Sequence, residues 1–207
     1  MAHIQLFELS PTRSDRARWA LLEADLDYES IGKKVEIIGS QELLAVHPLG
    51  KLPAVLIDGK PLFESAAIVT AIADLVPEKN LIAKPGTWNR NLHYQWMSFI
   101  LSELEPYVNS TEINSLDFVL PKGQHVPSII PQNAMLFQRH AKALEKRLQS
   151  ENYLVANQFS VTDIISAYTL HWGQEQKLLD KFPNLIAYLE RLYAREHCPL
   201  VQPNQSL

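Results

Sequence analysis

The sequence lacks the closely spaced glycines and histidines on which several common binding motifs depend. Even the nearest of its seven glycines, Gly32 and Gly39, are seven positions apart. This spacing excludes the dinucleotide fingerprint GxGxxG, the phosphate loop GxxxxGK(S/T) and the nucleophile elbow GxSxG. The seven histidines form no HExxH motif and no pair at helical spacing. We therefore expect no metal, and only a site built from distant segments stays open.

Cysteine, clustered positive charge and long apolar runs are also scarce. The one cysteine, Cys198, cannot form an internal disulfide, which is typical of the reducing cytoplasm. Lysine and arginine number 19 against 23 acidic residues, a net charge of −4, with no basic cluster that would indicate nucleic-acid binding. The longest stretch without a charge, 123–138, is shorter than the roughly 20 residues of a membrane helix. The start does not resemble a secretory signal, so we expect a cytoplasmic protein with no nucleic-acid or membrane partner.

What the sequence does contain is a folded-protein composition, 46 % hydrophobic and 20 % charged. Through Leu75 it alternates short apolar runs with segments of helical period. Asp58 and Gly59 predict a tight hairpin, because a type I′ turn needs positive φ at both central positions. The order βαβαββα follows from predicted strands at 4–9, 28–33, 54–57 and 61–63 and predicted helices at 14–24, 40–46 and 65–75.

The rest of the chain has helical periodicity only. We predict that residues 79–85, a polar segment with a proline, form a linker. After it, helices are predicted at 88–107, 133–149, 161–172 and 184–195. We therefore predict an α/β domain over residues 1–78, a linker over 79–86 and an all-helical domain over 87–207.

A hydroxyl-rich turn, containing Ser10, Thr12 and Ser14, joins the first predicted strand to its helix. A helix N-terminus has unpaired amides and about half a positive charge, so it favours an anion to which a hydroxyl can donate. The alternative is simple capping, in which Thr12 or Ser14 satisfies the amides of the first turn. The sequence leaves both interpretations open.

Two further segments combine features of a peptide-binding surface. In HPLGKLPAV, residues 47–55, Pro53 begins a strand, where a cis Leu52–Pro53 bond would be tolerated. Glu64 and Ser65 stand at a helix start, where the serine and the first amides suit a carboxylate and Glu64 suits an ammonium. The pair fits the two ends of an amino acid, and a plain N-cap with an acidic neighbour is the alternative.

Together these features resemble the cytosolic glutathione transferase family. The likeness rests on HPxGKLP at 47–53, the Asp58–Gly59 hairpin, ESxxI at 64–68 and the all-helical half. It implies a thioredoxin-like N-terminal domain that binds glutathione and an all-helical C-terminal domain that forms the second-substrate site. It also implies a buried capping box in which Asp163 accepts a hydrogen bond from the Ser160 amide.

The resemblance also assigns glutathione-binding roles. Leu52, beside a cis Pro53, would pair its backbone with the cysteinyl part of glutathione, and the acid–serine pair would hold the γ-glutamyl end. His47 and Lys51 would lie near the glycyl carboxylate, although Lys51 is equally interpreted as a solvated loop charge. The implied glutathione-binding residues are His47, Lys51, Leu52, Pro53, Glu64 and Ser65.

Catalysis would require the glutathione sulfur to be a thiolate at neutral pH. Lowering the pKa of a thiol from about 8.5 by about two units takes roughly 2.7 kcal/mol, which one aimed hydroxyl plus a helix N-terminus can supply. Thr12 occupies the place of the catalytic serine in serine-type members, with Ser14 and then Ser10 as alternatives. The turn has no cysteine, and Tyr28 comes too late to be a first-strand catalytic tyrosine.

The leading functional prediction is an enzyme that conjugates glutathione, as co-substrate, to small electrophiles. A glutathione-dependent reductase of disulfides or peroxides without a protein cysteine is one alternative. A non-catalytic binding protein that retains the fold is another, because fold does not fix function. The resemblance implies a homodimer.

Overall fold

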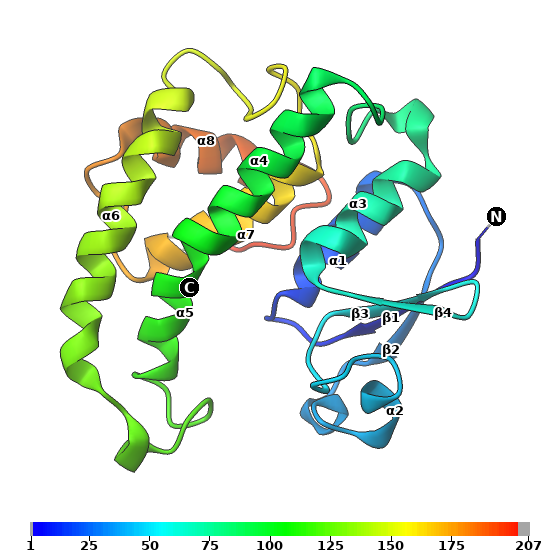
Figure 1. Ribbon diagram of the computed structural model, residues 1–207, viewed down its shortest axis with the longest axis horizontal. Helices are drawn as coiled ribbons and strands as arrows, with labels where there is room; N and C mark the ends of the chain where they lie inside the picture. Colours follow the sequence, from blue (N-terminus) through cyan, green and yellow to red (C-terminus); the bar gives the residue numbers. More distant parts are fainter. Residues whose placement is uncertain (1, 203–207) are drawn as a thin grey trace.

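The computed structural model describes residues 2–202, which form a small sheet domain beside a helical domain (Figure 1). The four strands are β1 (Ile4–Glu8), β2 (Glu29–Gly32), β3 (Ala54–Ile57) and β4 (Lys60–Phe63), in the spatial order β2-β1-β3-β4. Strand β2 is parallel to β1, whereas β3 and β4 pair antiparallel. The predicted βαβαββα order is confirmed.

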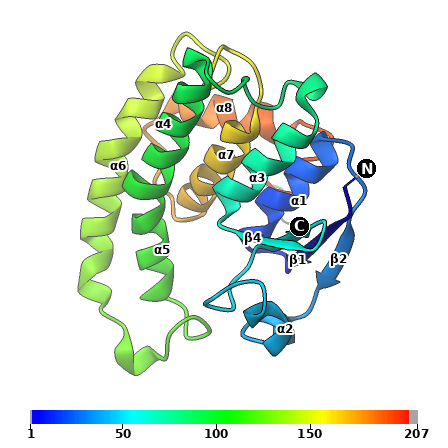
Figure 2. The ribbon, with the colours of Figure 1, turned by 45° about the vertical axis from the view of Figure 1, so that its right-hand side comes forward.

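Alternating side chains divide the sheet between two hydrophobic clusters. Leu6 and Val55, paired across β1 and β3, pack into the main core with α1 (Ser14–Glu23) and α3 (Ser65–Leu75). Their neighbours on the opposite face pack in a smaller cluster with α2 (Gln41–Leu44). Figure 2 shows α1 and α3 on one side of the sheet and α2 on the other. Helical cover on both faces therefore leaves the ends of the strands free to form a site.

The hairpin between β3 and β4 has the predicted turn. Asp58 and Gly59 have φ angles of 50° and 75°, positive at both central positions. The Asp58 carboxylate also accepts a hydrogen bond from the His3 amide at 2.8 Å, which ties the turn to the start of β1. The turn chemistry visible in the sequence therefore sets the register that carries β4 into α3.

The helical domain has one more break than the sequence analysis predicted. Its main helices are α4 (Trp88–Glu103), α5 (Glu105–Ile113), α6 (Ile130–Arg147), α7 (Val161–Glu175) and α8 (Pro183–Tyr193). The predicted helix 88–107 is wrong, because the chain leaves helical geometry at Leu104, with φ −121°, and restarts at Glu105. Pro106 explains the break, since proline fits the first turn of a helix but not its interior. Short 3₁₀ turns occupy Val35–Ile37, Pro77–Lys79, Lys122–Gln124 and Pro127–Ile129.

A continuous hydrophobic core joins the two domains, with α1 and α3 packed against α7. The start of α7 has the predicted capping box, in which Asp163 Oδ2 accepts from the Ser160 amide at 2.9 Å. Asp163 Oδ1 also accepts from the Leu154 amide and the Tyr188 hydroxyl, at 3.1 and 2.7 Å. The carboxylate thus joins the start of α7 to Leu154 and to α8 within the helical domain. Within residues 2–202 no helix is long and apolar enough to cross a membrane.

Candidate active site

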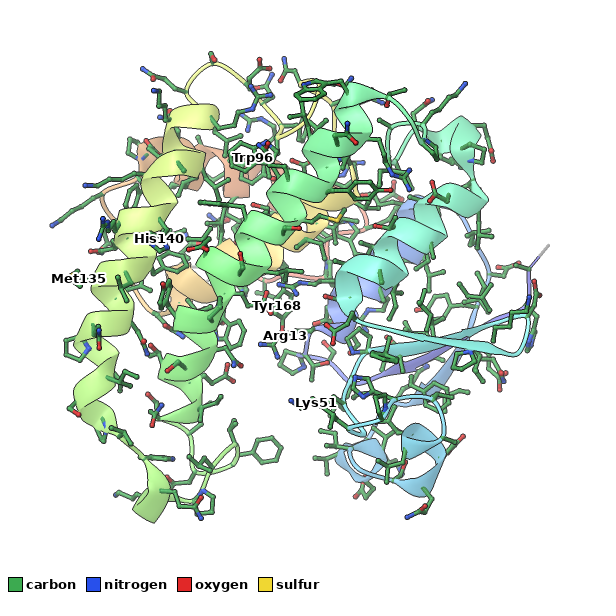
Figure 3. The ribbon with its side chains drawn as sticks, viewed as in Figure 1. Arg13, Lys51, Trp96, Met135, His140 and Tyr168 are labelled. Carbon is green, nitrogen blue, oxygen red and sulfur yellow. The ribbon has the colours of Figure 1, made fainter. Side chains whose placement is uncertain are left out.

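A cavity of about 550 Å³ lies where the sheet domain faces α4 and α5. It brings together seven of the nine predicted site residues, and Figure 3 shows Lys51 and the neighbouring Arg13 between the two domains. Four apolar residues, contributed by both domains, also line the cavity. The predicted residues in the lining are Thr12, His47, Lys51, Leu52, Pro53, Glu64 and Ser65, and the apolar ones are Ile38, Leu101, Ile113 and Val119.

The Glu64–Ser65 pair lies at the beginning of α3. Glu64 has a φ of 71°, in the left-handed region that costs a residue with a Cβ about 1–3 kcal/mol, and such strain clusters at binding sites. Ser65 does not act through simple capping, since its Oγ accepts a hydrogen bond from Arg16 Nη1 at 3.1 Å. Its own hydroxyl hydrogen therefore stays available to donate to a ligand carboxylate at the α3 N-terminus.

The 47–53 segment supplies a second part of the cavity lining. The Leu52–Pro53 peptide bond is cis, as the resemblance implies, and both residues line the cavity. His47 is buried, with Nδ1 accepting from the Leu49 amide at 3.0 Å and its ring 4.9 Å from the Phe63 ring. These contacts fix the imidazole as part of the cavity wall.

The three hydroxyls of the first turn have different surroundings. Ser14 is fully buried, and its Oγ accepts from the Leu9 amide at 3.0 Å and lies 2.8 Å from the Leu9 carbonyl oxygen. Thr12 Oγ1 lies 2.5 Å from both that carbonyl and Ser14 Oγ. Because Ser14 alone satisfies the Leu9 carbonyl, the Thr12 hydrogen can turn to a ligand without leaving that carbonyl unpaired. Of the three hydroxyls, Thr12 is the one that lines the cavity. Which of them activates a bound thiol stays a prediction.

Ser10 faces a second cavity, of about 390 Å³, on the α7 side of the turn. It is joined to Pro11 by a cis bond that the sequence analysis did not predict, and its hydroxyl donates to Asp15 at 3.2 Å. Cys198 is a free cysteine in which burial raises the thiol pKa to about 11. Neither residue lines the 550 Å³ cavity.

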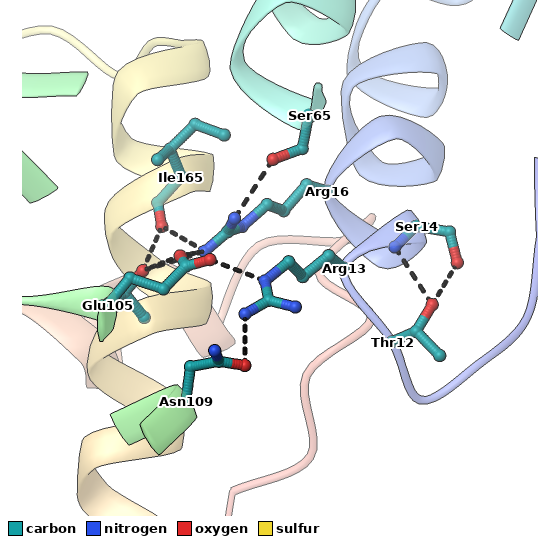
Figure 4. Close-up of polar contacts among 9 residues, drawn as sticks. Thr12, Arg13, Ser14, Arg16, Ser65, Glu105, Asn109 and Ile165 are labelled. Carbon is teal, nitrogen blue, oxygen red and sulfur yellow. Dashed lines mark hydrogen bonds and ion pairs between the residues drawn. The ribbon is translucent and has the colours of Figure 1, made fainter. Parts of the chain in front are cut away.

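A buried ion cluster supports the cavity, and the sequence analysis missed it. Glu105 accepts from Arg13 Nε at 2.6 Å through Oε1 and from Arg16 through Oε2 (Figure 4). Arg16, with a side chain only 1 % exposed, also donates to Thr169 at 2.8 Å. Through Arg16, which donates to Ser65, the cluster connects the helical domain to the beginning of α3.

The Glu105 carboxylate is ionised in the folded protein. Burial alone would raise its pKa, but the charges and hydrogen bonds of Arg16 and Arg13 outweigh burial and hold the pKa at about 2. One carboxylate thus forms ion pairs with two guanidinium groups. No local pattern could reveal a pair 92 positions apart, and the only signal was the presence of Arg13 within the hydroxyl-rich turn.

Within residues 2–202, no group of three or more histidine, cysteine, aspartate or glutamate side chains is placed to hold a metal ion. The donors of the cavity are amides, hydroxyls and cations. This set suits a ligand that carries anionic groups such as carboxylates.

Comparisons with known proteins agree with this geometry. Residues 2–74 match the family model "Glutathione S-transferase, N-terminal domain", and residues 136–196 match "Glutathione S-transferase, C-terminal domain". Glutathione S-transferase GstA of Escherichia coli O157:H7 is 26 % identical over 164 residues, covering 78 % of this chain and 77 % of its own. Disulfide-bond oxidoreductase YfcG of Escherichia coli K12 is 28 % identical over 188 residues, covering 84 % and 83 %.

A solved structure of a sphingomonad glutathione S-transferase complexed with glutathione superimposes with a TM-score of 0.81, at 26 % identity, covering 94 % of both chains. The chain also matches elongation factor 1-gamma 3 of Oryza sativa subsp. japonica, at 27 % identity over 152 residues, but that match spans only 35 % of the plant protein. Matches in both halves, together with the fold and the cavity, show that the chain belongs to the glutathione S-transferase family.

Proposed function

We propose that the protein is a glutathione transferase that conjugates the glutathione thiolate to small electrophilic molecules, with a role in detoxification. The observation that carries this proposal is the convergence of three features in one cavity. These features are the α3 N-terminus with Glu64 and Ser65, the Leu52–Pro53 segment, and the Thr12 turn at the start of α1. Each suits one part of a γ-glutamyl-cysteinyl-glycine tripeptide, and the complex of a related transferase with glutathione supports the assignment.

The cavity would hold the tripeptide by both ends. Glu64 would accept from the γ-glutamyl ammonium, and Ser65 with the first α3 amides would donate to the neighbouring carboxylate. Lys51 and His47 would face the glycyl carboxylate, and the Leu52 backbone would pair with the cysteinyl unit. This pose places the sulfur beside Thr12 and the opening turn of α1.

Conjugation to a chloronitroaromatic illustrates the chemistry. The thiol proton leaves to water, the thiolate attacks the ring carbon, a C–S bond forms, the C–Cl bond breaks and chloride departs. The enzyme contributes by keeping the sulfur ionised and by holding the ring near it. Ile38, Leu101, Ile113 and Val119 supply an apolar wall for the electrophile.

Turnover assays test the proposal directly. We expect measurable conjugation of glutathione to a chloronitroaromatic and retention of the protein on immobilised glutathione, with release by free glutathione. Retention without turnover of any electrophile or disulfide would instead indicate a binding protein, and absence of retention would contradict a glutathione site.

Disulfide reduction is a second candidate, favoured by the similarity to a disulfide-bond oxidoreductase. In this reaction the bound thiolate attacks a glutathionyl mixed disulfide, oxidised glutathione forms, and the released thiolate takes up the proton. The electron balance is complete with glutathione alone, so no protein thiol is needed. Faster turnover of a mixed disulfide than of a chloronitroaromatic would favour this candidate.

Replacing Ser65 by alanine is expected to weaken glutathione binding about tenfold or more. The variant loses a hydrogen bond to a charged carboxylate, worth about 1.5–3 kcal/mol. Calorimetric titration with glutathione provides the measurement. The matched control is Ser115→Ala, which removes an exposed hydroxyl bonded only to the Thr111 carbonyl and should leave the affinity unchanged. Equal affinities of both variants would remove Ser65 from the binding site.

We also propose that the protein is a cytoplasmic homodimer. A groove of about 540 Å³ between α3 and α4 is lined by apolar residues that include Ala67, Ala71 and Met97, and by the Asp74–Arg90 ion pair. Apolar grooves with a polar rim are typical of subunit interfaces. Sedimentation equilibrium should give a mass twice that of one chain, and cell fractionation tests the compartment.

A further inference from the structure

A groove of about 670 Å³ lies between α6 and the segment that leads into α8. None of its lining residues also lines the 550 Å³ cavity. Figure 3 shows Met135, one of its residues, on the side of α6 that faces away from the sheet domain. We call it the α6 groove, and its lining includes Ala134, Met135, Arg139, Lys142, Lys181 and Phe182.

The apolar part of the α6 groove has an exposed edge and a buried base. Met135 is 58 % exposed, whereas Phe182 is only 6 % exposed. The packing of α6 does not use Met135, because the buried positions of this helix, Phe137 and Ala141 among them, face the main core. Covering Met135 with an apolar group of a partner is therefore favourable.

The charged part of the α6 groove is entirely positive. Arg139, Lys142 and Lys181 line it, and no carboxylate does. Among residues 2–202, none of these three cations forms an ion pair. Of the acidic residues nearby in sequence, Glu145 accepts hydrogen bonds from the start of α8, and Asp180 does not line the groove. In a chain of net charge −4, the α6 groove is therefore a local surface that attracts negative charge.

The apolar and charged residues follow one another along α6. Positions 135, 139 and 142 stand at i, i+4 and i+7, so their side chains share one face of the helix. The helical rise places Arg139 and Lys142 about 6 and 10 Å beyond Met135 along the axis. A matching ligand has an apolar group at one end and carboxylates about one to two helical turns away.

The exposure of these residues favours a protein segment over a small molecule or a nucleic acid. Pockets for small ligands bury most of the ligand surface, whereas the three cations and Met135 are all exposed. Unpaired nucleic-acid bases stack on exposed aromatic rings, and the aromatic ring of this groove, Phe182, is buried. An amphipathic peptide fits, because it supplies its own bulk on the open side of the groove.

We infer that the α6 groove binds an acidic amphipathic segment of a partner protein. An apolar side chain of that segment contacts Met135 above Phe182. Its carboxylates form ion pairs with Arg139, Lys142 and Lys181. The interaction requires no glutathione, so it stands apart from the proposed function.

Selection from a random peptide library displayed on phage, with the unmodified protein as target, tests the inference. We expect the enriched peptides to combine aspartate or glutamate with leucine, isoleucine or phenylalanine. A labelled synthetic copy of the most enriched peptide is then titrated with each variant by fluorescence anisotropy at low ionic strength. Arg139→Glu combined with Lys142→Glu should weaken binding about tenfold or more, because both changes repel the peptide carboxylates. Met135→Ser should weaken it about fivefold.

The matched control is Lys34→Glu combined with Lys60→Glu, which reverses two exposed charges of the sheet domain and should leave the peptide affinity unchanged. All the replaced side chains are exposed, so we expect circular dichroism spectra equal to that of the unmodified protein. Enrichment of no peptide, or equal binding of the peptide to the α6 variants and the unmodified protein, would overturn the inference. Saturable binding of decanoate at the same residues without peptide enrichment would assign the groove to a small amphiphile and also overturn it. A smaller mass of the Arg139→Glu, Lys142→Glu variant in sedimentation would assign the groove to a second copy of this chain, with the same consequence.

Discussion

Replacing Glu105 by glutamine is expected to lower the free energy of unfolding by about 3–5 kcal/mol, the usual effect of removing one partner from a buried ion pair. The change keeps the size of the side chain and removes its charge. Arg16, whose side chain is 1 % exposed, would then remain charged in the core with no carboxylate beside it. Because Arg16 also donates to Ser65, we expect glutathione affinity to fall in the same variant.

Urea unfolding at pH 7, followed by tryptophan fluorescence, measures this effect. The matched control is Glu103→Gln, two positions earlier, whose half-exposed carboxylate faces His140 at 3.3 Å. It should change the free energy of unfolding by no more than about 0.5 kcal/mol. Equal stabilities of the two variants would contradict a structural role for the Glu105 cluster.

Acidification from pH 6.5 to pH 4 is expected to cost the protein on the order of 3 kcal/mol through His93 alone. Burial, with a smaller contribution from the Arg90 charge, lowers the pKa of His93 from 6.5 to about 4. Its Nε2 accepts from the Ala83 amide at 3.2 Å, and Nδ1 lies 2.8 Å from the Thr162 hydroxyl. Neutral His93 therefore ties the linker to both α4 and α7.

The direction of the pH dependence of stability follows from proton binding to the folded and unfolded chains. Between pH 4 and pH 6.5 the unfolded chain binds a proton at this histidine and the folded chain does not, so stability is full above 6.5 and falls as the pH falls toward 4. Urea unfolding across this range, compared with His93→Gln, isolates the contribution. The variant should be less stable at neutral pH and lose less stability on acidification. If the free energies of unfolding of the two proteins changed in parallel with pH, the proposed contribution of His93 would be contradicted.

The sheet domain could be predicted closely because its signals are local. Short helices and strands end at turn-forming or helix-breaking residues, namely Pro48, Asp58–Gly59 and Pro77. The hairpin turn has the positive φ angles that its residues favour. The helical domain was predicted less well at one point. Helical periodicity continues through Leu104 and hides the break, which Pro106 marks as the first turn of a new helix, α5.

The cavity residues on the sheet domain were predictable for a different reason. Residues 47–53 and 64–65 each match a family motif within a short segment. The motif therefore identifies them as site residues without any knowledge of how the chain packs. Arg13, Arg16 and Glu105 meet only because α5 restarts beside α1, and no periodicity links positions about 90 residues apart. The part of the site that the helical domain supplies therefore needed the structure.

In the proposed mechanism, the cavity binds glutathione and holds its sulfur as a thiolate. Calorimetric titration with glutathione at pH 7, in two buffers of different ionisation enthalpy, measures both binding and proton release. A thiol pKa lowered by about two units predicts saturable binding with release of about 0.7 proton per glutathione. Absence of binding, or binding without proton release, would contradict the account.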